Sequence, residues 1–103
     1  MFIARWQINA KFGHKQKLIE MMQRWMKDVG PQAGFDKMEM MLTTGSIGAL
    51  EATIFVDHKV PSLAALEKGF EALAKVSAHQ KWGAEVEPYV VSGSSRWEIL
   101  RII

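Results

Sequence analysis

The side chains best suited to chemistry gather around His79, which Trp82 and Tyr89 follow at short intervals in the sequence. A histidine can hydrogen-bond a ligand or transfer a proton near neutral pH, and an aromatic ring can contact a flat apolar ligand. His79 falls near the expected end of a helix, where an imidazole can also bond the last carbonyl groups and complement the helix dipole. The sequence therefore leaves two roles open for His79: a ligand-binding or proton-transfer site, and a structural cap.

Other reactive groupings are missing from the sequence. The chain has no cysteine, which excludes disulfides and thiolate metal sites. No histidine and carboxylate have metal-ligand spacing, since Asp57 and His58 are adjacent and would point to opposite sides of a strand. His14 and His58 lie at expected element boundaries, where we expect solvated or capping roles. No G-x-S-x-G nucleophile motif is present. We therefore expect no metal and no cofactor.

Composition indicates one globular domain over residues 1–103. The chain is 49% hydrophobic and 23% charged, with a formal net charge of +2. Its charges are interspersed, whereas nucleic-acid binding usually requires a clustered basic face. Residues 1–9 alternate and include Arg5, which is unlike a signal peptide, and no apolar run approaches the ~20 residues of a membrane span. We expect a cytoplasmic protein that binds neither nucleic acid nor a membrane.

Hydrophobic periodicity predicts six main elements in the order strand, helix, strand, strand, helix, strand. Their expected ranges are strand 2–9, helix 14–29, strand 37–44, strand 49–57, helix 62–79 and strand 96–103, with a further helical turn or two within 80–87. Gly30 is expected to end the first helix in the left-handed conformation, and Ser62 to cap the second. This order is the ferredoxin-like βαββαβ unit, an α+β fold with a four-stranded antiparallel sheet and two helices on one face.

The helix-free face of this sheet mixes apolar and charged side chains. It is expected to display Ile3, Arg5, Gln7, Glu39, Met41, Glu51, Thr53 and Phe55, with two residues of the last strand from among Trp97, Ile99 and Arg101. A contiguous patch of this kind favours an interface. We expect a homodimer with sheet against sheet, in which Arg5 or Arg101 pairs with Glu39 or Glu51. The alternative is a monomer whose sheet is half solvated.

Three stretches of the sequence resemble a known superfamily: Ala78-His79-Gln80-Lys81-Trp82, Glu87-Pro88-Tyr89-Val90-Val91, and the strand Arg96-Trp97-Glu98-Ile99-Leu100-Arg101. Together with the βαββαβ order, they are similar to the dimeric α+β barrel superfamily. That superfamily includes antibiotic-biosynthesis-type monooxygenases, heme-degrading enzymes, stress-responsive barrel proteins and NIPSNAP-like proteins. The resemblance implies a homodimer whose two sheets close a barrel, with a cleft between the helices and the sheet of each subunit.

The heme-degrading branch implies a catalytic pair within this cleft. That branch has an asparagine on the first strand and a histidine after the second helix, and Asn9 and His79 are in corresponding places. It also has an aromatic residue on the second helix, where this chain has no tryptophan and the nearest aromatic is Phe70, nine residues before His79. This departure disfavours heme degradation. The alternative role for Asn9 is a turn residue that bonds its own backbone.

Three functions remain open. In the first, the homodimer binds a small hydrophobic or aromatic molecule in its helix–sheet cleft, and one version of it is a cofactor-independent monooxygenase with His79 and Asn9 as catalytic residues. The expected ligand-binding residues are Trp82, Tyr89, Met22, Trp25 and Phe70. In the second, the protein is a non-catalytic structural or interaction protein, and these side chains are core. RNA binding ranks third, because Glu39 and Glu51 on the sheet would repel phosphates.

Overall fold

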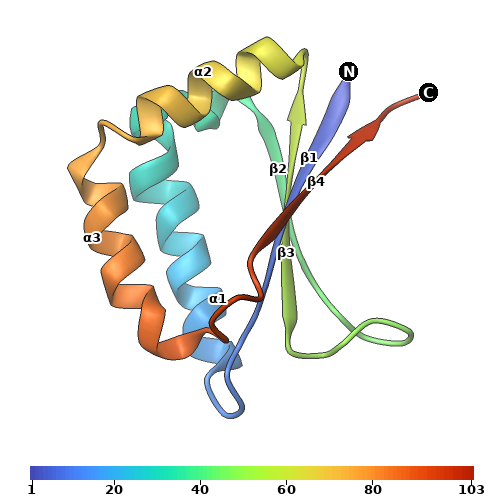
Figure 1. Ribbon diagram of the computed structural model, residues 1–103, viewed down its shortest axis with the longest axis vertical. Helices are drawn as coiled ribbons and strands as arrows, with labels where there is room; N and C mark the ends of the chain where they lie inside the picture. Colours follow the sequence, from blue (N-terminus) through green and yellow to red (C-terminus); the bar gives the residue numbers. More distant parts are fainter.

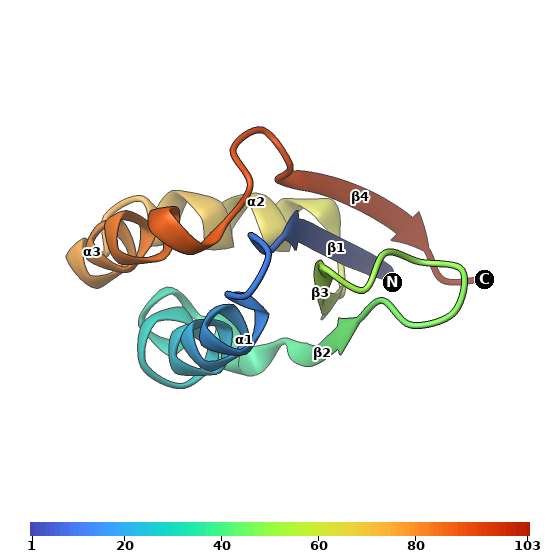
Figure 2. The ribbon, with the colours of Figure 1, turned by 90° about the horizontal axis from the view of Figure 1, so that it is seen from below.

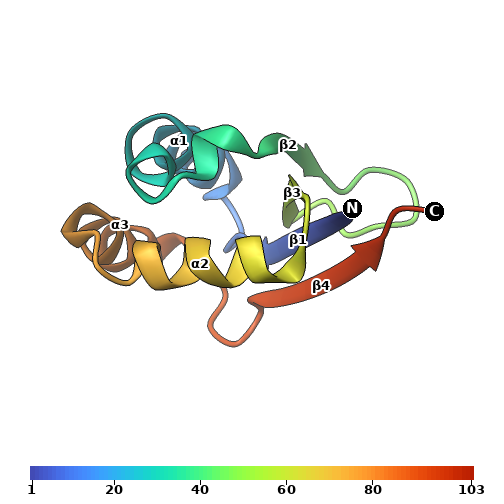
Figure 3. The same cartoon turned by 90° about the horizontal axis from the view of Figure 1, so that it is seen from above.

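The computed structural model describes all 103 residues and confirms the expected order of elements. Its strands form one antiparallel sheet in the order β2-β3-β1-β4. The element bounds are β1 Phe2–Asn9, α1 Lys15–Arg24, β2 Glu39–Thr44, β3 Thr53–Val60, α2 Leu63–Leu73, α3 Ser77–Val86 and β4 Arg96–Arg101. Figure 1 shows all the helices on one side of the sheet. Figures 2 and 3 show α1 on one half of that face and the α2–α3 pair on the other.

The core lies between the helices and the sheet. Its buried members include Ile8, Leu18, Met21, Met22, Phe35, Ile54, Val56, Leu73, Trp82 and Val86. The alternating residues of β1 and β3 and the apolar stripes of the helices thus meet as their periodicities predict.

The first helical layer extends beyond α1 and ends differently from the prediction. It continues as a π-helical segment, Trp25–Val29, and then as a 3-10 turn, Gly30–Ala33. The left-handed conformation predicted for Gly30 is wrong, since its φ is −54° and the left-handed residue is Gly34, with φ 84°. Glycine is needed at position 30 for space, because a Cβ there would lie 2.9 Å from Cζ3 of Trp25. The indole of Trp25 therefore rests against the backbone at Gly30.

The second helix is interrupted, and this changes the place of His79. Ser62 caps α2 as predicted, accepting a hydrogen bond of 3.1 Å from the backbone N–H of Ala65. The helix stops at Leu73, and α3 starts after the extended residue Val76, with φ −90° and ψ 108°. His79 thus lies in the first turn of α3 and not at the C-terminus of a helix. The predicted role of its side chain in capping terminal carbonyl groups is therefore wrong.

The third strand is displaced from its predicted range, 49–57. The hairpin closes where Thr44 Oγ1 donates a hydrogen bond of 2.9 Å to the carbonyl of Thr53, so β3 begins at Thr53. Glu51 consequently lies in the loop between β2 and β3 rather than on the sheet face. Figure 2 shows that this loop extends on the helix-free side of the sheet. The alternation of residues 49–60 is continuous, and it therefore gave no sign of where the strand begins.

The extension of β3 as far as Val60 places a histidine in the core. Side chains at positions 54, 56, 58 and 60 point toward the helices and are buried. His58 is one of them, with 2% of its surface exposed. The solvated or capping role predicted for His58 is therefore wrong, because the strand continues past the predicted boundary. Its neighbour Asp57 points to the opposite side of the sheet, as predicted.

The last strand shows the reverse of the predicted orientation. Trp97 is paired with Trp6, and Ile99 with Ala4, which is fully buried under the helices. Directly paired residues share a face of a sheet. On β4, Trp97, Ile99 and Arg101 therefore point toward the helices, although they were the residues predicted for the opposite side. The residues that β4 presents on the helix-free face are Arg96, Glu98 and Leu100. Alternation indicates which residues share a face but not which face is buried.

Within the single chain, the ion pairs along the helix-free face differ from those predicted. Arg5 makes two hydrogen bonds of 2.9 Å to the carboxylate of Asp57, rather than pairing with Glu39 or Glu51. Glu39 lies 3.8 Å from the ammonium group of Lys59. The cause is register, since β1 places Arg5 directly beside Asp57 on β3.

Gly30→Ala is expected to lower the free energy of unfolding by about 1–3 kcal/mol, because the added Cβ would meet Trp25 at 2.9 Å and Phe35 at 3.3 Å. Gly83→Ala is the matched control, since a Cβ on this residue of α3 meets nothing within 4 Å. Alanine in place of a helical glycine is expected to stabilise by about 0.5–1 kcal/mol. Urea unfolding followed by circular dichroism gives both values. Equal effects of the two substitutions would contradict the tight contact at Gly30.

Candidate functional site

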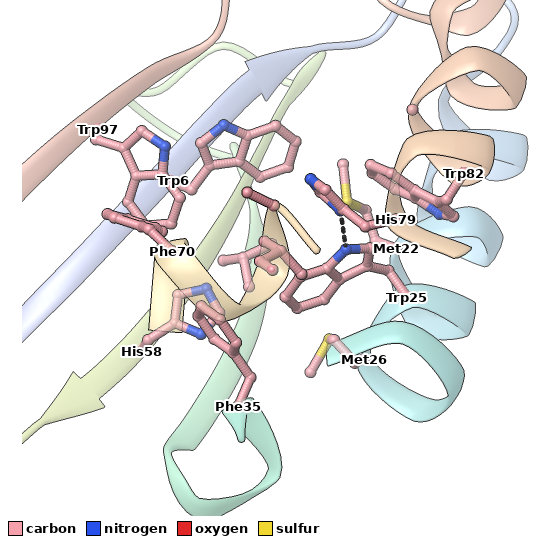
Figure 4. A pocket seen from close by; sticks show the side chains of 14 residues that line it. Trp6, Met22, Trp25, Met26, Phe35, His58, Phe70, His79, Trp82 and Trp97 are labelled. Carbon is pink, nitrogen blue, oxygen red and sulfur yellow. Dashed lines mark hydrogen bonds between the residues drawn. The ribbon is translucent and has the colours of Figure 1, made fainter. Parts of the chain in front are cut away.

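A cavity of about 470 Å³ lies between the helices and the sheet (Figure 4). Its lining residues are Trp6, Met22, Trp25, Met26, Phe35, Val56, His58, Phe70, Leu73, Ala74, His79, Trp82, Gly83 and Trp97. Eleven of these 14 residues are hydrophobic, and none is Asp, Glu, Lys or Arg. The polar side chains of the wall are therefore two histidines and the indole groups of the tryptophans.

Trp25, in the π-helical segment, lies at the centre of the aromatic side chains around the cavity. Its ring is edge-on to the rings of Phe35 and Trp82, with centroid distances of 5.4 and 6.4 Å. This is a favoured geometry for aromatic pairs. Its Nε1 donates a hydrogen bond of 3.0 Å to Nδ1 of His79, the dashed line in Figure 4. The bond joins the first helical layer to α3, and π-helical turns often occur at functional sites.

The hydrogen bond from Trp25 determines what His79 can do. Because Nδ1 accepts that bond, the neutral imidazole holds its proton on Nε2, which is then a donor. Burial lowers the pKa of His79 below its usual value, so the neutral form predominates at pH 7. The ring is stacked on that of Trp82, at 6.3 Å and 13°. Trp82 is itself fixed by a hydrogen bond of 2.7 Å from its Nε1 to the carbonyl of Met21.

His58 approaches the cavity from β3. Burial lowers the pKa of His58 to about 4, against the opposite effect of the Asp57 carboxylate. The side chain is therefore neutral at pH 7. Its ring is stacked on Trp97 at 5.8 Å and edge-on to Phe35 at 5.3 Å. Its Nδ1 is buried and has no hydrogen-bond partner.

The cavity opens between α2 and β4. Of the residues that line it, Phe70, Ala74 and Trp97 are exposed. The rings of Phe70 and Trp97 are edge-on at a centroid distance of 5.0 Å. Phe35 and His58, by contrast, are 1% and 2% exposed. The site thus has exposed aromatic rings at its mouth, and the buried His58 lies directly behind one of them, Trp97.

Most of the predicted site residues come together in this cavity. Trp82, Met22, Trp25 and Phe70 all line it, together with His79. They come from α1, the π-helical segment, α2 and α3, whose apolar stripes all face the sheet.

Asn9 and Tyr89 lie elsewhere. The side chain of Asn9 is on the helix-free face, where its Oδ1 accepts a hydrogen bond of 2.6 Å from Thr53 Oγ1. Alternation along β1 puts Ile8 toward the helices and therefore turns Asn9 away from His79. The ring of Tyr89 lies 5.5 Å from that of His14 and does not line the cavity. The structure thus does not bring Asn9 and His79 together.

Several lining residues were not predicted. Trp6 and Trp97 are paired across β1 and β4, and the sequence signal for them was the shared alternation of these two strands. His58 had a weaker signal, since Ile54, Val56, His58 and Val60 continue one alternation. No local pattern indicates Phe35, which reaches the cavity from a second 3-10 turn, Phe35–Lys37.

The chain has no group of three or more His, Asp or Glu side chains arranged to hold a metal ion. None of its helices combines the length and the apolar character needed to cross a membrane.

Comparisons with known proteins show likeness in structure alone. No family model matches this sequence, and no curated protein matches it either. A NIPSNAP-like domain protein from Burkholderia xenovorans is 11% identical, with a TM-score of 0.81 over 99% of this chain and 84% of that chain. A NIPSNAP family protein from Agrobacterium tumefaciens is 15% identical, with a TM-score of 0.80 over 99% and 92%. An antibiotic biosynthesis monooxygenase is 9% identical, with a TM-score of 0.70 over 100% and 99%.

Identities this low show the fold and nothing more specific. The chain has the ferredoxin-like α+β fold that NIPSNAP-family proteins and antibiotic biosynthesis monooxygenase-like proteins share, which confirms the resemblance seen in the sequence.

His58→Phe is expected to flatten the pH dependence of stability. Between about pH 6.5 and pH 4, the unfolded wild-type chain takes up a proton on this histidine and the folded chain does not, so the free energy of unfolding falls as the pH falls. Over this pH window the free energy of unfolding of the wild-type protein falls by about 3 kcal/mol through this histidine, and His58→Phe does not show this decrease. Urea unfolding at pH 7.0, 5.5 and 4.5 measures it. Parallel pH profiles for the two proteins would contradict a neutral, buried His58.

Proposed function

We propose that the protein binds small uncharged apolar or aromatic molecules in the cavity between its helices and its sheet. The observation that supports this most strongly is the cavity itself, about 470 Å³ in volume and walled by aromatic and aliphatic side chains. Pockets that hold small ligands typically have volumes of roughly 300–1,000 Å³ and a few polar groups in an apolar wall. A protein that needed only a core would fill this space, because empty volume costs stability.

The charge of the lining defines the class of ligand. No ionised side chain borders the cavity, and both of its histidines are neutral at pH 7. Moving an ion into such a space costs free energy, because no side chain of opposite charge is there to pair with it. Carboxylates and ammonium compounds are therefore disfavoured, and flat neutral molecules fit between the edges of the rings.

Oxygenation of the bound molecule without a cofactor is the second candidate, favoured by the structural likeness to an antibiotic biosynthesis monooxygenase. His79 is the residue on which proton transfer would depend. However, the lone pair on its Nδ1 accepts the hydrogen bond from the indole N–H of Trp25, and its Nε2 carries the proton. In this geometry His79 can donate a hydrogen bond but cannot accept a proton. The contacts therefore favour binding over catalysis.

The proposal includes a homodimer that packs sheet against sheet. On the helix-free face, Met41 is 62% exposed and Leu100 is 42% exposed. Arg5 and Asp57 on the same face are already paired by two hydrogen bonds, so a partner can cover them without leaving either charge unpaired. Ile47, fully exposed in the loop on this side, offers further apolar surface. An isologous pairing would remove these side chains from water.

Naphthalene is expected to bind the wild-type protein with a Kd on the order of tens of micromolar. Heteronuclear NMR should show shifts of the four indole N–H signals, since all four tryptophans line the cavity. Gly83→Leu, which adds a side chain in the wall, should weaken binding about tenfold or more. Ala84→Leu, the neighbouring exposed position on α3, should leave it unchanged. An absence of saturable shifts would instead favour a structural or interaction protein.

Met41→Lys is expected to shift the protein from dimer to monomer, because it replaces an exposed apolar side chain of the proposed interface with a charged one. Leu63→Lys is the matched control, since Leu63 is 50% exposed on α2, away from this face. Sedimentation velocity at micromolar concentration measures both. A wild-type protein that sediments as a monomer, or a Met41→Lys variant that stays dimeric, would count against the sheet-to-sheet dimer.

A further inference from the structure

His58 contains the only buried side-chain nitrogen or oxygen in this chain that has no hydrogen-bond partner, its Nδ1. Burying a polar group without a partner costs free energy, and folded proteins satisfy nearly all such groups. A phenylalanine would fill the same space without that cost. A ligand cannot reach this sealed nitrogen, so the physical reason for a histidine at the wall of the cavity must lie with its other nitrogen, Nε2, which also has no partner in the chain.

The chain itself offers His58 no partner. The nearest side chains are rings, with Phe35, Trp97 and Trp25 at centroid distances of 5.3, 5.8 and 6.2 Å. The indole N–H of Trp25 is donated to His79, and that of Trp6 is donated to Ser95 at 2.8 Å. The indole N–H of Trp97 makes no hydrogen bond within the chain, but the ring of Trp97 is stacked on the imidazole, so this in-plane N–H is not directed at the nitrogens of His58.

Water does not satisfy this histidine well either. A buried water molecule usually makes two to four hydrogen bonds. The walls around His58 are aromatic rings, so the imidazole would be the main hydrogen-bond partner of a water there. His79 differs in this respect, since it is only partly buried and its Nδ1 already has a partner.

The two nitrogens of His58 have different surroundings. Nδ1 is sealed from solvent, and Figure 4 shows Phe35 close to one edge of the ring and a nitrogen on the edge that faces the cavity. A buried N–H without a partner is rarer in proteins than an acceptor that is not used. The proton of the neutral ring is therefore best placed on Nε2, where it points to whatever occupies the cavity.

We infer that His58 is the hydrogen-bond donor for the buried end of the ligand, and that the ligand is an uncharged aromatic molecule with a carbonyl or hydroxyl oxygen at that end. This inference rests on the proposed binding function and specifies the ligand further. The oxygen of the ligand lies beside His58, next to the rings of Phe35 and Trp97, and its aromatic part extends across the cavity toward His79 and Trp82, which Figure 4 shows on the other side.

The test compares indane with 1-indanone, which has the same bicyclic outline and a carbonyl in place of one methylene. Calorimetry gives the Kd of each for the wild-type protein and for His58→Phe, which keeps a flat ring. Loss of the donor leaves the ketone oxygen unpaired in the cavity, so the ratio of the 1-indanone Kd to the indane Kd should rise about tenfold. The Kd of indane should change by less than about threefold. His79→Phe should raise the ratio less, because water reaches His79.

A second measurement uses only the wild-type protein, and it tests the role of His58 even if His58→Phe does not fold. Long-range ¹H–¹⁵N spectra should show the imidazole nitrogens of His58 shifting at saturating 1-indanone and staying in place with indane. The inference would be overturned if the ratio of the two Kd values in folded His58→Phe stayed within about twofold of the wild-type ratio. It would also be overturned if the chemical shifts of the His58 nitrogens did not change on addition of 1-indanone. If indane binds and the ratio does not change, only this inference fails. If neither naphthalene nor indane binds, the proposed function fails as well.

Discussion

The hydrogen bond from Trp25 to His79 is the interaction on which the site depends. It joins the π-helical segment of the first helical layer to α3 in the other, across one wall of the cavity. Its geometry requires that the indole lie against Gly30, where a Cβ would be 2.9 Å away. The indole also lies edge-on to Phe35 and to Trp82, the second of which is on α3. The same bond determines the tautomer of His79, so one contact sets both the shape and the polarity of the wall.

The two faces of the sheet separate charge from apolar volume. On β3, Asp57 points to the helix-free face and is neutralised by Arg5, while the next residue, His58, points into the cavity and remains neutral. A strand achieves this division through its two-residue period alone. The cavity therefore excludes charge, and the opposite face holds its charges in pairs among exposed apolar side chains. The first face is suited to a small neutral ligand, and the second to another copy of the chain.

The order of elements and the gathering of Trp25, Phe70, His79 and Trp82 could be predicted from the sequence, because helical and strand periodicities are local signals. The details that could not be predicted depend on long-range contacts. Residues 49–60 alternate without interruption, so only pairing with β1 and β2 determines that β3 starts at Thr53 and places His58 in the core. No glycine or proline marks the break between α2 and α3. The face that β4 buries is likewise determined by its pairing with β1, which places Trp97 beside Trp6.

Ligand binding depends on an open, apolar, uncharged cavity between the helices and the sheet. A crystal structure under xenon pressure tests it most directly, because xenon enters apolar cavities that stay open and dry. We predict xenon density in the space bounded by Trp25, Phe70 and Trp97. Crystals without xenon there, in which tryptophan and methionine side chains fill the space, would contradict it.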